Sequence, residues 1–213
     1  MTGYIFDLDG TIADSMWAWK DTIKIFLTHV GLPADKETVA DFFELTLQQT
    51  VHYLKEKFDF DITEEKVITG LNSIMIKFYE SKVEAKPGAI EFLGKAQAAG
   101  IPMIICTSTD RPLVEAALNH IGISDYFKDI ITTTEAGSGK GDTKIFDLCL
   151  KSLGTTAENT WLFEDSLYAI IGGNKAGLNT LGIYEKTCEY NQDKIKEEAD
   201  IYVEDWTEAI PKF

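Results

Sequence analysis

The sequence predicts an α/β fold: a Rossmann-like core with a mostly parallel sheet, and an all-helical domain inserted into it. Short apolar runs typical of buried strands alternate with amphipathic stretches of helical length, which is the pattern of a parallel sheet. The alternation stops between residues 16 and 82, where only helical patterns are found. A length of 213 residues with 45% hydrophobic content suits a core domain carrying one insertion.

Six apolar runs are the expected strands of the core. The first is GYIFDL, whose apolar residues run directly into a pair of aspartates. Helix-length stretches separate most of the later runs, so we expect the strands to be joined by helices and to lie mostly parallel. The runs cover residues 3–8, 101–108, 129–134, 160–165, 179–184 and 200–205.

The stretches between these runs carry the signals of helix ends. Stretch 111–122 has a proline just inside its start and ends on glycine, and stretch 142–154 also ends on glycine. Stretch 166–177 follows the fourth expected strand. Its Gly172 and Gly173 weaken it as a helix and indicate close packing of the backbone.

The interval after the first strand predicts an inserted helical domain. We expect its boundaries to lie at residues 16 and 82, with a core domain formed by 1–15 and 83–213. A further helical stretch with a proline near its start returns the chain to the second strand. The expected helices cover residues 16–31, 35–58, 63–82 and 86–100.

Composition excludes several classes of protein. The net charge of −15 argues against binding of nucleic acid, which requires clusters of Lys and Arg at the phosphates. The three cysteines are far apart and form no disulfide or metal pattern, so a reducing compartment is expected. No signal peptide and no apolar run of about 18 residues is found, which predicts a cytoplasmic protein without a membrane partner. The sequence gives no indication of oligomeric state.

Polar residues with catalytic potential follow the expected strands. In an open parallel sheet, ligands bind beyond the carboxyl ends of the strands, so residues at these ends are expected to share one edge. Four segments that are distant in the sequence supply carboxylates, hydroxyls and one ammonium there. These residues are Asp7 and Asp9, Thr107 and Ser108, Glu164 and Asp165, and Lys140 in the stretch GSGKGD.

The pair Asp7 and Asp9 carries a specific implication. The two residues are two apart on an extended segment, so their side chains leave from the same face. Carboxylates at such close range repel each other unless a cation or a strong proton donor lies near them. The sequence therefore predicts a positive partner at this strand end.

Four motifs carry a resemblance to a known family. They are DLDGT at the first strand, Thr107 in IICTS, Lys140 in GKGDTKIF, and the acidic FEDS that contains Glu164 and Asp165. In this order they resemble the motifs of the haloacid dehalogenase superfamily of phosphohydrolases. The resemblance covers essentially the whole chain and indicates the branch with a helical cap domain inserted after the first strand.

The resemblance implies roles for the first and last motifs. Asp7 would be the nucleophile that forms an aspartyl-phosphate, and Asp9 the acid and base. Mg²⁺ would be held by Asp7, the backbone carbonyl of Asp9, and Asp165. Glu164 would orient a metal-bound water or bind the metal directly.

The second and third motifs would bind the phosphoryl group. By resemblance, Thr107 and the backbone N–H of Ser108 supply neutral donors, and Lys140 supplies a positive charge. Lys144 is an alternative to Lys140. In the cap, Trp19, Thr46 and Gln48 are expected to contact substrate, with Trp17 an alternative aromatic group.

The expected function is a Mg²⁺-dependent phosphatase that acts on a small phosphorylated metabolite, such as a sugar phosphate or phosphoglycolate. An alternative is a phosphotransferase resembling beta-phosphoglucomutase; a third is a binding module without catalysis. At the positions where that mutase carries a cap histidine and a phosphate-binding arginine, this chain has Trp19 and Leu47. Neither residue can bind a second phosphate or shuttle a proton, which favours hydrolysis. Dehalogenation is disfavoured, because the dehalogenases of the family lack the second aspartate that stands here as Asp9.

Overall fold

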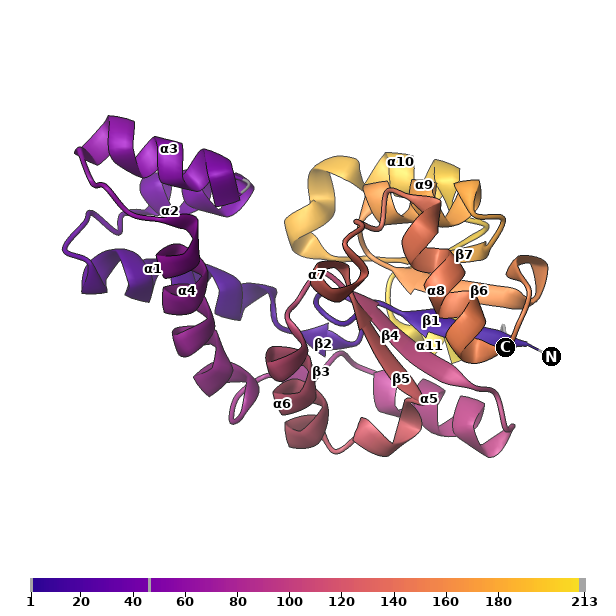
Figure 1. Ribbon diagram of the computed structural model, residues 1–213. Helices are drawn as coiled ribbons and strands as arrows, with labels where there is room; N and C mark the ends of the chain where they lie inside the picture. The colour runs from indigo at the N-terminus through magenta and orange to yellow at the C-terminus, as the bar shows by residue number, and fades with distance from the viewer. Residues whose placement is uncertain (1, 46, 211–213) are drawn as a thin grey trace. The chain divides into compact units, whose positions relative to one another are not determined.

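The chain forms two compact units. The computed structural model describes residues 2–45 and 47–210. The first unit extends up to Asp14 and resumes at Glu84, and the second spans Ser15–Val83 (Figure 1). None of the helices in the described ranges is long and apolar enough to span a membrane.

The first unit is built on a six-stranded sheet in the order β5-β4-β1-β6-β7-β8, in which every neighbouring pair is parallel. Each strand falls within one of the six predicted runs, which confirms the predicted parallel core. The strands are β1 (Gly3–Phe6), β4 (Met103–Thr107), β5 (Asp129–Thr132), β6 (Thr160–Glu164), β7 (Asn179–Ile183) and β8 (Ile201–Val203).

Helices cover both faces of this sheet. One face carries α8 (Thr143–Leu153), α9 (Leu167–Lys175) and α10 (Gln192–Glu198), and the other carries α5 (Ala89–Ala98), α6 (Arg111–Ile121) and α11 (Trp206–Ala209) (Figure 1). Because both faces are covered, all four residues of β1 are buried, and the strand reads as a continuous apolar run.

Two packed layers form the core on either side of β1. Phe6 stacks on Phe163 at a ring separation of 4.5 Å, and Trp206 packs against both Phe92 and Phe163. The Trp206 indole N–H donates to the backbone carbonyl of Thr11 at 2.9 Å, which ties α11 to the loop after β1. The opposite layer is mostly aliphatic and includes two cysteines: Ile5, Ile104, Cys106, Ile145, Phe146, Cys149, Leu153, Leu162 and Leu178.

A short antiparallel pair joins the two segments that lead into and out of the second unit. β2 (Ala13–Asp14) pairs with β3 (Glu84–Ala85). The sequence does not predict this pair, because two residues are too few to show strand alternation. Between residues 84 and 210 the structure also has the short helix α7 (Thr133–Ala136) and 3₁₀ turns at Ser124–Tyr126, Ala157–Asn159 and Lys186–Asn191.

The described residues of the second unit form four helices: α1 (Met16–His29), α2 (Lys36–Glu44), α3 (Leu47–Phe58) and α4 (Glu64–Tyr79). They enclose an apolar core: Ile23, Phe26, Leu27, Phe42, Leu54 and Val67. The prediction of one helix over 35–58 is wrong. Leu45 is extended, with ψ of 145°, so α2 ends before α3 begins. The stretch contains neither Gly nor Pro, so no local signal marks the break.

Candidate active site

The order of strands brings the predicted residues together. β1 lies between β4 and β6, and Phe6 is paired with both Ile105 and Phe163. The Asp7 backbone N–H continues the ladder by donating to the Phe163 carbonyl at 3.0 Å. Asp7 therefore lies beside Glu164, the last residue of β6. The strands that follow β1 in the sequence are added first on one side of it, as β4 and β5, and then on the other side, as β6, β7 and β8. In such folds a ligand usually binds at the carboxyl ends of the strands where this change of side occurs.

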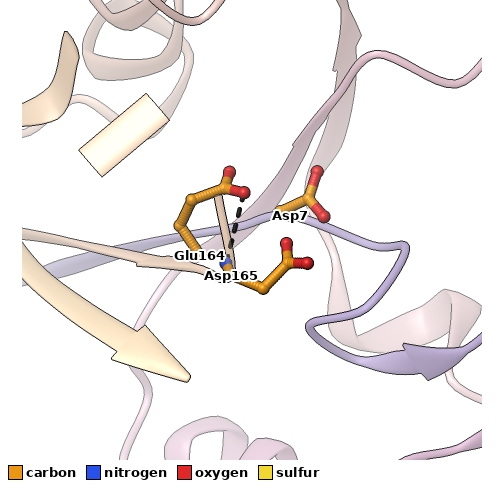
Figure 2. Close-up of side chains that lie close together, drawn as sticks. All are labelled: Asp7, Glu164 and Asp165. Carbon is orange, nitrogen blue, oxygen red and sulfur yellow. Dashed lines mark hydrogen bonds between the residues drawn. The ribbon is translucent and has the colours of Figure 1, made fainter. Parts of the chain in front are cut away.

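Three buried carboxylates and one ammonium form the centre of the site. Asp7, Glu164 and Asp165 each bring a carboxylate oxygen within 4.8 Å of the other two (Figure 2). The Lys140 ammonium lies between two of them, 2.5 Å from Asp7 Oδ1 and 2.7 Å from Glu164 Oε2. Only 3% of the Lys140 side chain is exposed, so solvent does not screen these contacts.

Lys140 reaches this position because α9 packs closely on its backbone. A Cβ atom on Gly172 would overlap the Lys140 carbonyl oxygen, and one on Gly173 would lie 2.6 Å from Leu162 Cδ2. Glycine lowers the helix propensity of α9 at these two positions, but it allows the α9 backbone to lie close to the loop that carries Lys140 and to β6. The structure confirms the close backbone packing that the glycine pair predicts.

Burial and mutual repulsion shift the pKa values of the acids. Burial, followed by the nearby Glu164 carboxylate, raises the pKa of Asp7 to about 7, against the opposing effect of Lys140. The same causes raise the pKa of Asp165 well above its usual range. Burial alone would lower the pKa of the Lys140 ammonium, but Asp7 and Glu164 raise it well above 10.5. Lys140 is therefore charged at neutral pH.

The charge of this cluster fits a divalent cation. Three carboxylates and one ammonium leave two negative charges in a buried space when all are ionised, and such charge requires a counter-ion. Carboxylate oxygens are the ligands that hard divalent cations prefer. The cluster can accordingly hold such an ion through Asp7 and Asp165.

Glu164 is engaged at both of its oxygens. Its Oε1 accepts from the backbone N–H groups of Asp165 and Ser166 at 3.2 and 3.1 Å, and from the Ser166 hydroxyl at 2.7 Å. Its Oε2 accepts from Lys140. This arrangement suits a residue that holds Lys140 and the loop after β6 in place.

Asp165 has two further neighbours that sequence analysis did not identify. The Thr11 hydroxyl donates to Asp165 Oδ1 at 3.3 Å, and the Cys188 Sγ lies 3.7 Å from Oδ2. Burial and then the Asp165 charge raise the pKa of Cys188 to about 12, so this group is a neutral thiol at physiological pH. It adds no negative charge to the cluster.

Asp9 is bound to the loop after β4. The Thr109 hydroxyl donates to Asp9 Oδ2 at 2.6 Å, and the Thr109 backbone N–H donates to Thr107 Oγ1 at 3.2 Å. Thr107 is buried, whereas Ser108 is exposed and its hydroxyl lies 3.2 Å from the Tyr168 hydroxyl. Thr109 was not among the predicted site residues, although its position two residues after Thr107 places it on the same loop. No sequence signal pointed to the tyrosine.

The remaining predicted residues lie outside this cluster or outside the described part of the structure. Lys144 is exposed in the first turn of α8, whereas the buried Lys140 ammonium pairs with Asp7 and Glu164, so Lys140 is the lysine that the fold brings to the acids. Trp19 is half-buried in α1 of the second unit. Gln48 is in α3, but its side chain, like all of Thr46, is outside the described residues.

Comparison with known proteins defines the family. The model of the Haloacid dehalogenase-like hydrolase family matches residues 4–183, which is most of the chain. The chain therefore belongs to this family of hydrolases, as the four motifs predicted, and it is an enzyme.

Individual relatives agree with this assignment. The phosphoglycolate phosphatase of Yersinia pestis is 27% identical over 198 residues, covering 89% of this chain and 82% of that protein. Hexitol phosphatase A of Escherichia coli is 26% identical over 181 residues, covering 85% and 82%. The structure of CbbY from Rhodobacter sphaeroides in complex with phosphate superposes with a TM-score of 0.84 at 20% identity, covering 98% and 96%. The last comparison supports the fold alone.

Proposed function

We propose that this protein is a Mg²⁺-dependent phosphatase that hydrolyses a small phosphomonoester, of the sugar phosphate or phosphoglycolate type, through an aspartyl-phosphate on Asp7. The observation that carries the proposal is the buried Lys140 ammonium between Asp7 and Glu164, with Asp165 beside them. This arrangement supports a carboxylate nucleophile, a fixed positive charge and an acidic cation site at the carboxyl ends of β1 and β6.

Asp7 is positioned to act as the nucleophile. Its carboxylate attacks phosphorus while the bond from phosphorus to the ester oxygen breaks, so the phosphoryl group moves to Asp7. Lys140 favours the ionised form of Asp7 and supplies positive charge where the phosphoryl oxygens would lie. Thr107 and the Ser108 backbone N–H are proposed as neutral donors to the same oxygens.

Asp9 is proposed to move the protons. In the first step it donates a proton to the departing ester oxygen. In the second step it takes a proton from water as that water attacks the phosphorus, which releases phosphate and restores the Asp7 carboxylate. The Thr109 hydroxyl donates to Asp9 Oδ2 and so fixes the direction in which the acid points.

When bound, Mg²⁺ would supply the positive charge that allows a carboxylate to approach a phosphate dianion. Asp7, Asp165 and the backbone carbonyl of Asp9 are its proposed ligands, and the buried excess of negative charge supports them. The two curated relatives named above are phosphatases of small phosphorylated molecules, and their similarity over most of the chain supports the same substrate class here.

A screen of purified protein tests the proposal. Phosphate release from a panel that includes 2-phosphoglycolate, hexitol phosphates and sugar phosphates is measured with Mg²⁺ and with EDTA. We expect Mg²⁺-dependent turnover of at least one ester, lost in Asp7→Asn because an amide is neither an effective nucleophile nor an anionic ligand. Asp193→Asn, an exposed change in α10, is the matched control. Unchanged turnover in Asp7→Asn would refute the mechanism.

The same assay separates hydrolysis from the phosphotransferase alternative. The enzyme is given beta-glucose 1-phosphate with catalytic glucose 1,6-bisphosphate and Mg²⁺, and glucose 6-phosphate and free phosphate are followed together. The half-buried indole of Trp19 has neither the charge to bind a second phosphate nor a basic group to shuttle protons. We therefore expect free phosphate to form faster, and faster formation of glucose 6-phosphate would establish the mutase.

A further inference from the structure

Lys86 lies outside the four motifs, yet its ammonium binds three acceptors from two distant segments. Lys86 Nζ is 2.6 Å from the Gly10 carbonyl oxygen, 2.7 Å from the Tyr184 carbonyl oxygen and 3.0 Å from Glu185 Oε2. Gly10 belongs to the loop after β1, whereas Tyr184 and Glu185 follow β7. All three donors of the ammonium are thereby used.

The ion pair between Lys86 and Glu185 is largely, though not fully, buried. The exposed fractions of the Lys86 and Glu185 side chains are 14% and 9%. The other Glu185 oxygen, Oε1, accepts from the backbone N–H and the hydroxyl of Thr187 at 3.1 and 3.2 Å. A buried pair is costly to desolvate and is weak evidence for stability, so its presence calls for another explanation.

Gly10 connects this pair to the candidate active site. It has a φ of +83°, and a Cβ atom there would overlap Asp165 Oδ2 and lie 3.2 Å from Glu185 Cγ. Gly10 is thus held between the acid of the fourth motif and the partner of Lys86. It also follows Asp9 directly in the sequence, so a displacement of Gly10 as a whole is passed on to the backbone of Asp9.

Lys86 is also fixed at its backbone. Its N–H donates to the Ile12 carbonyl at 2.7 Å, directly after β3, through which the chain returns from the second unit. The backbone N–H and the side-chain ammonium of Lys86 therefore both bind the segment 10–12. Two carbonyl oxygens and a carboxylate are also the kind of ligands that bind a metal cation, and here the Lys86 ammonium takes the place of that cation.

We propose that Lys86 is a positioning residue, whose ammonium holds the Gly10 carbonyl so that Asp9 and Asp165 keep the geometry that the reaction requires. This inference rests on the proposed phosphatase function. The Lys86 ammonium is bonded to Gly10, Tyr184 and Glu185, so its proposed effect on Asp9 and Asp165 passes through the loop after β1. Misplacement of reacting groups by about 1 Å can cost about 10²-fold in rate, so loss of this contact is expected to lower kcat more than it raises KM.

Chemical rescue provides the decisive test. Lys86→Ala removes the three methylene groups and the ammonium of the side chain, and n-propylammonium has these same groups. We expect Lys86→Ala to lose about 10- to 100-fold in kcat, and n-propylammonium to restore several-fold more activity than tetramethylammonium, which cannot donate hydrogen bonds. Lys86→Arg should retain part of the activity. Lys95→Ala, an exposed lysine paired with Glu91 in α5, is the matched control and should match wild type.

A second readout does not depend on turnover. Because Gly10 packs on Asp165, Lys86→Ala is expected to weaken Mg²⁺ binding about 10-fold in calorimetric titration, whereas Lys95→Ala leaves it unchanged. Activity of Lys86→Ala within two-fold of wild type, or a loss that n-propylammonium does not restore, would overturn the positioning role. A wild-type protein that cleaves no ester would instead refute the proposed function. In that case unchanged Mg²⁺ affinity in Lys86→Ala refutes the positioning role as well, and weakened affinity supports it.

Discussion

Removal of the Lys140 ammonium is the perturbation for which the structure gives the largest expected effect. At 2.5 and 2.7 Å from two carboxylate oxygens, each attraction is about 6 kcal/mol by Coulomb's law at an effective dielectric constant of about 20. Desolvation of the buried charges offsets part of this attraction. Lys140→Ala leaves Asp7, Glu164 and Asp165 together without a cation, and removal of one partner from a buried pair costs about 3–5 kcal/mol.

The assay has two arms. Urea unfolding of Lys140→Ala in EDTA should show a free energy of unfolding lowered by about 3–5 kcal/mol near neutral pH. Protonation of the buried carboxylates reduces this loss, because a neutral carboxyl group needs no cation. Phosphate release by the Mg²⁺-loaded variant should fall by about 10²–10³-fold, the loss typical of one transition-state donor. Lys144→Ala, which removes an exposed lysine four residues away, is the control and should change the free energy of unfolding by less than about 0.5 kcal/mol.

Two results would refute this reasoning. Equal unfolding free energies for Lys140→Ala and Lys144→Ala would mean that the ion pairs do not exist in solution. A large loss of stability with normal turnover would mean that the ammonium serves folding alone. Lys140→Met, which keeps most of the side-chain volume, separates the charge from the cavity, because its loss of stability should be nearly as large as that of Lys140→Ala.

Three further predictions concern the same edge of the sheet. In EDTA the pKa of Asp7 is about 7 in the folded protein and about 3.9 in an unfolded chain. The folded state then holds a proton that the unfolded state has lost, so the free energy of unfolding in urea should fall from pH 4 to pH 7, and Mg²⁺ should reduce this slope. Asp9→Asn should retain Mg²⁺ binding in calorimetry but lose about 10²–10⁴-fold in turnover, and a loss of only a few-fold would exclude it as the acid. Gly172→Ala should displace the Lys140 backbone and lower turnover about 10²-fold, whereas Gly139→Ala, where a Cβ has open space, should not.

The sheet and the site could be predicted because both follow from local rules. A strand covered by helices on both faces must be apolar at every position, and β1 with its four buried residues shows this directly. Parallel strands end at one edge, so residues that directly follow them, such as Asp7 and Asp165, must come close together whatever lies between them in the sequence. Strand ends therefore identify the site without knowledge of any contact.

Contacts that depend on the backbone could not be predicted in this way. Lys86 binds the carbonyl groups of Gly10 and Tyr184. Every residue has a backbone carbonyl, so the sequence does not indicate which of them accept such a hydrogen bond. The same reason applies to the two-residue pair β2–β3 and to the end of α2 at Leu45, where no glycine or proline marks the change in backbone direction. Tertiary packing decides these features, and propensity alone does not report it.

The role of Glu164 shows how hydrogen bonds separate two alternatives that the sequence leaves open. As a direct metal ligand it would have to share Oε2 between the metal and the Lys140 ammonium, because Oε1 already accepts three hydrogen bonds. Glu164→Gln can keep the bonds at Oε1, and its amide N–H groups then face the Lys140 ammonium as a second donor. We therefore expect this variant to lose turnover while its Mg²⁺ affinity, measured by calorimetric titration, falls much less than that of Asp165→Asn. Equal losses of Mg²⁺ affinity in the two variants would show that Glu164 binds the metal directly.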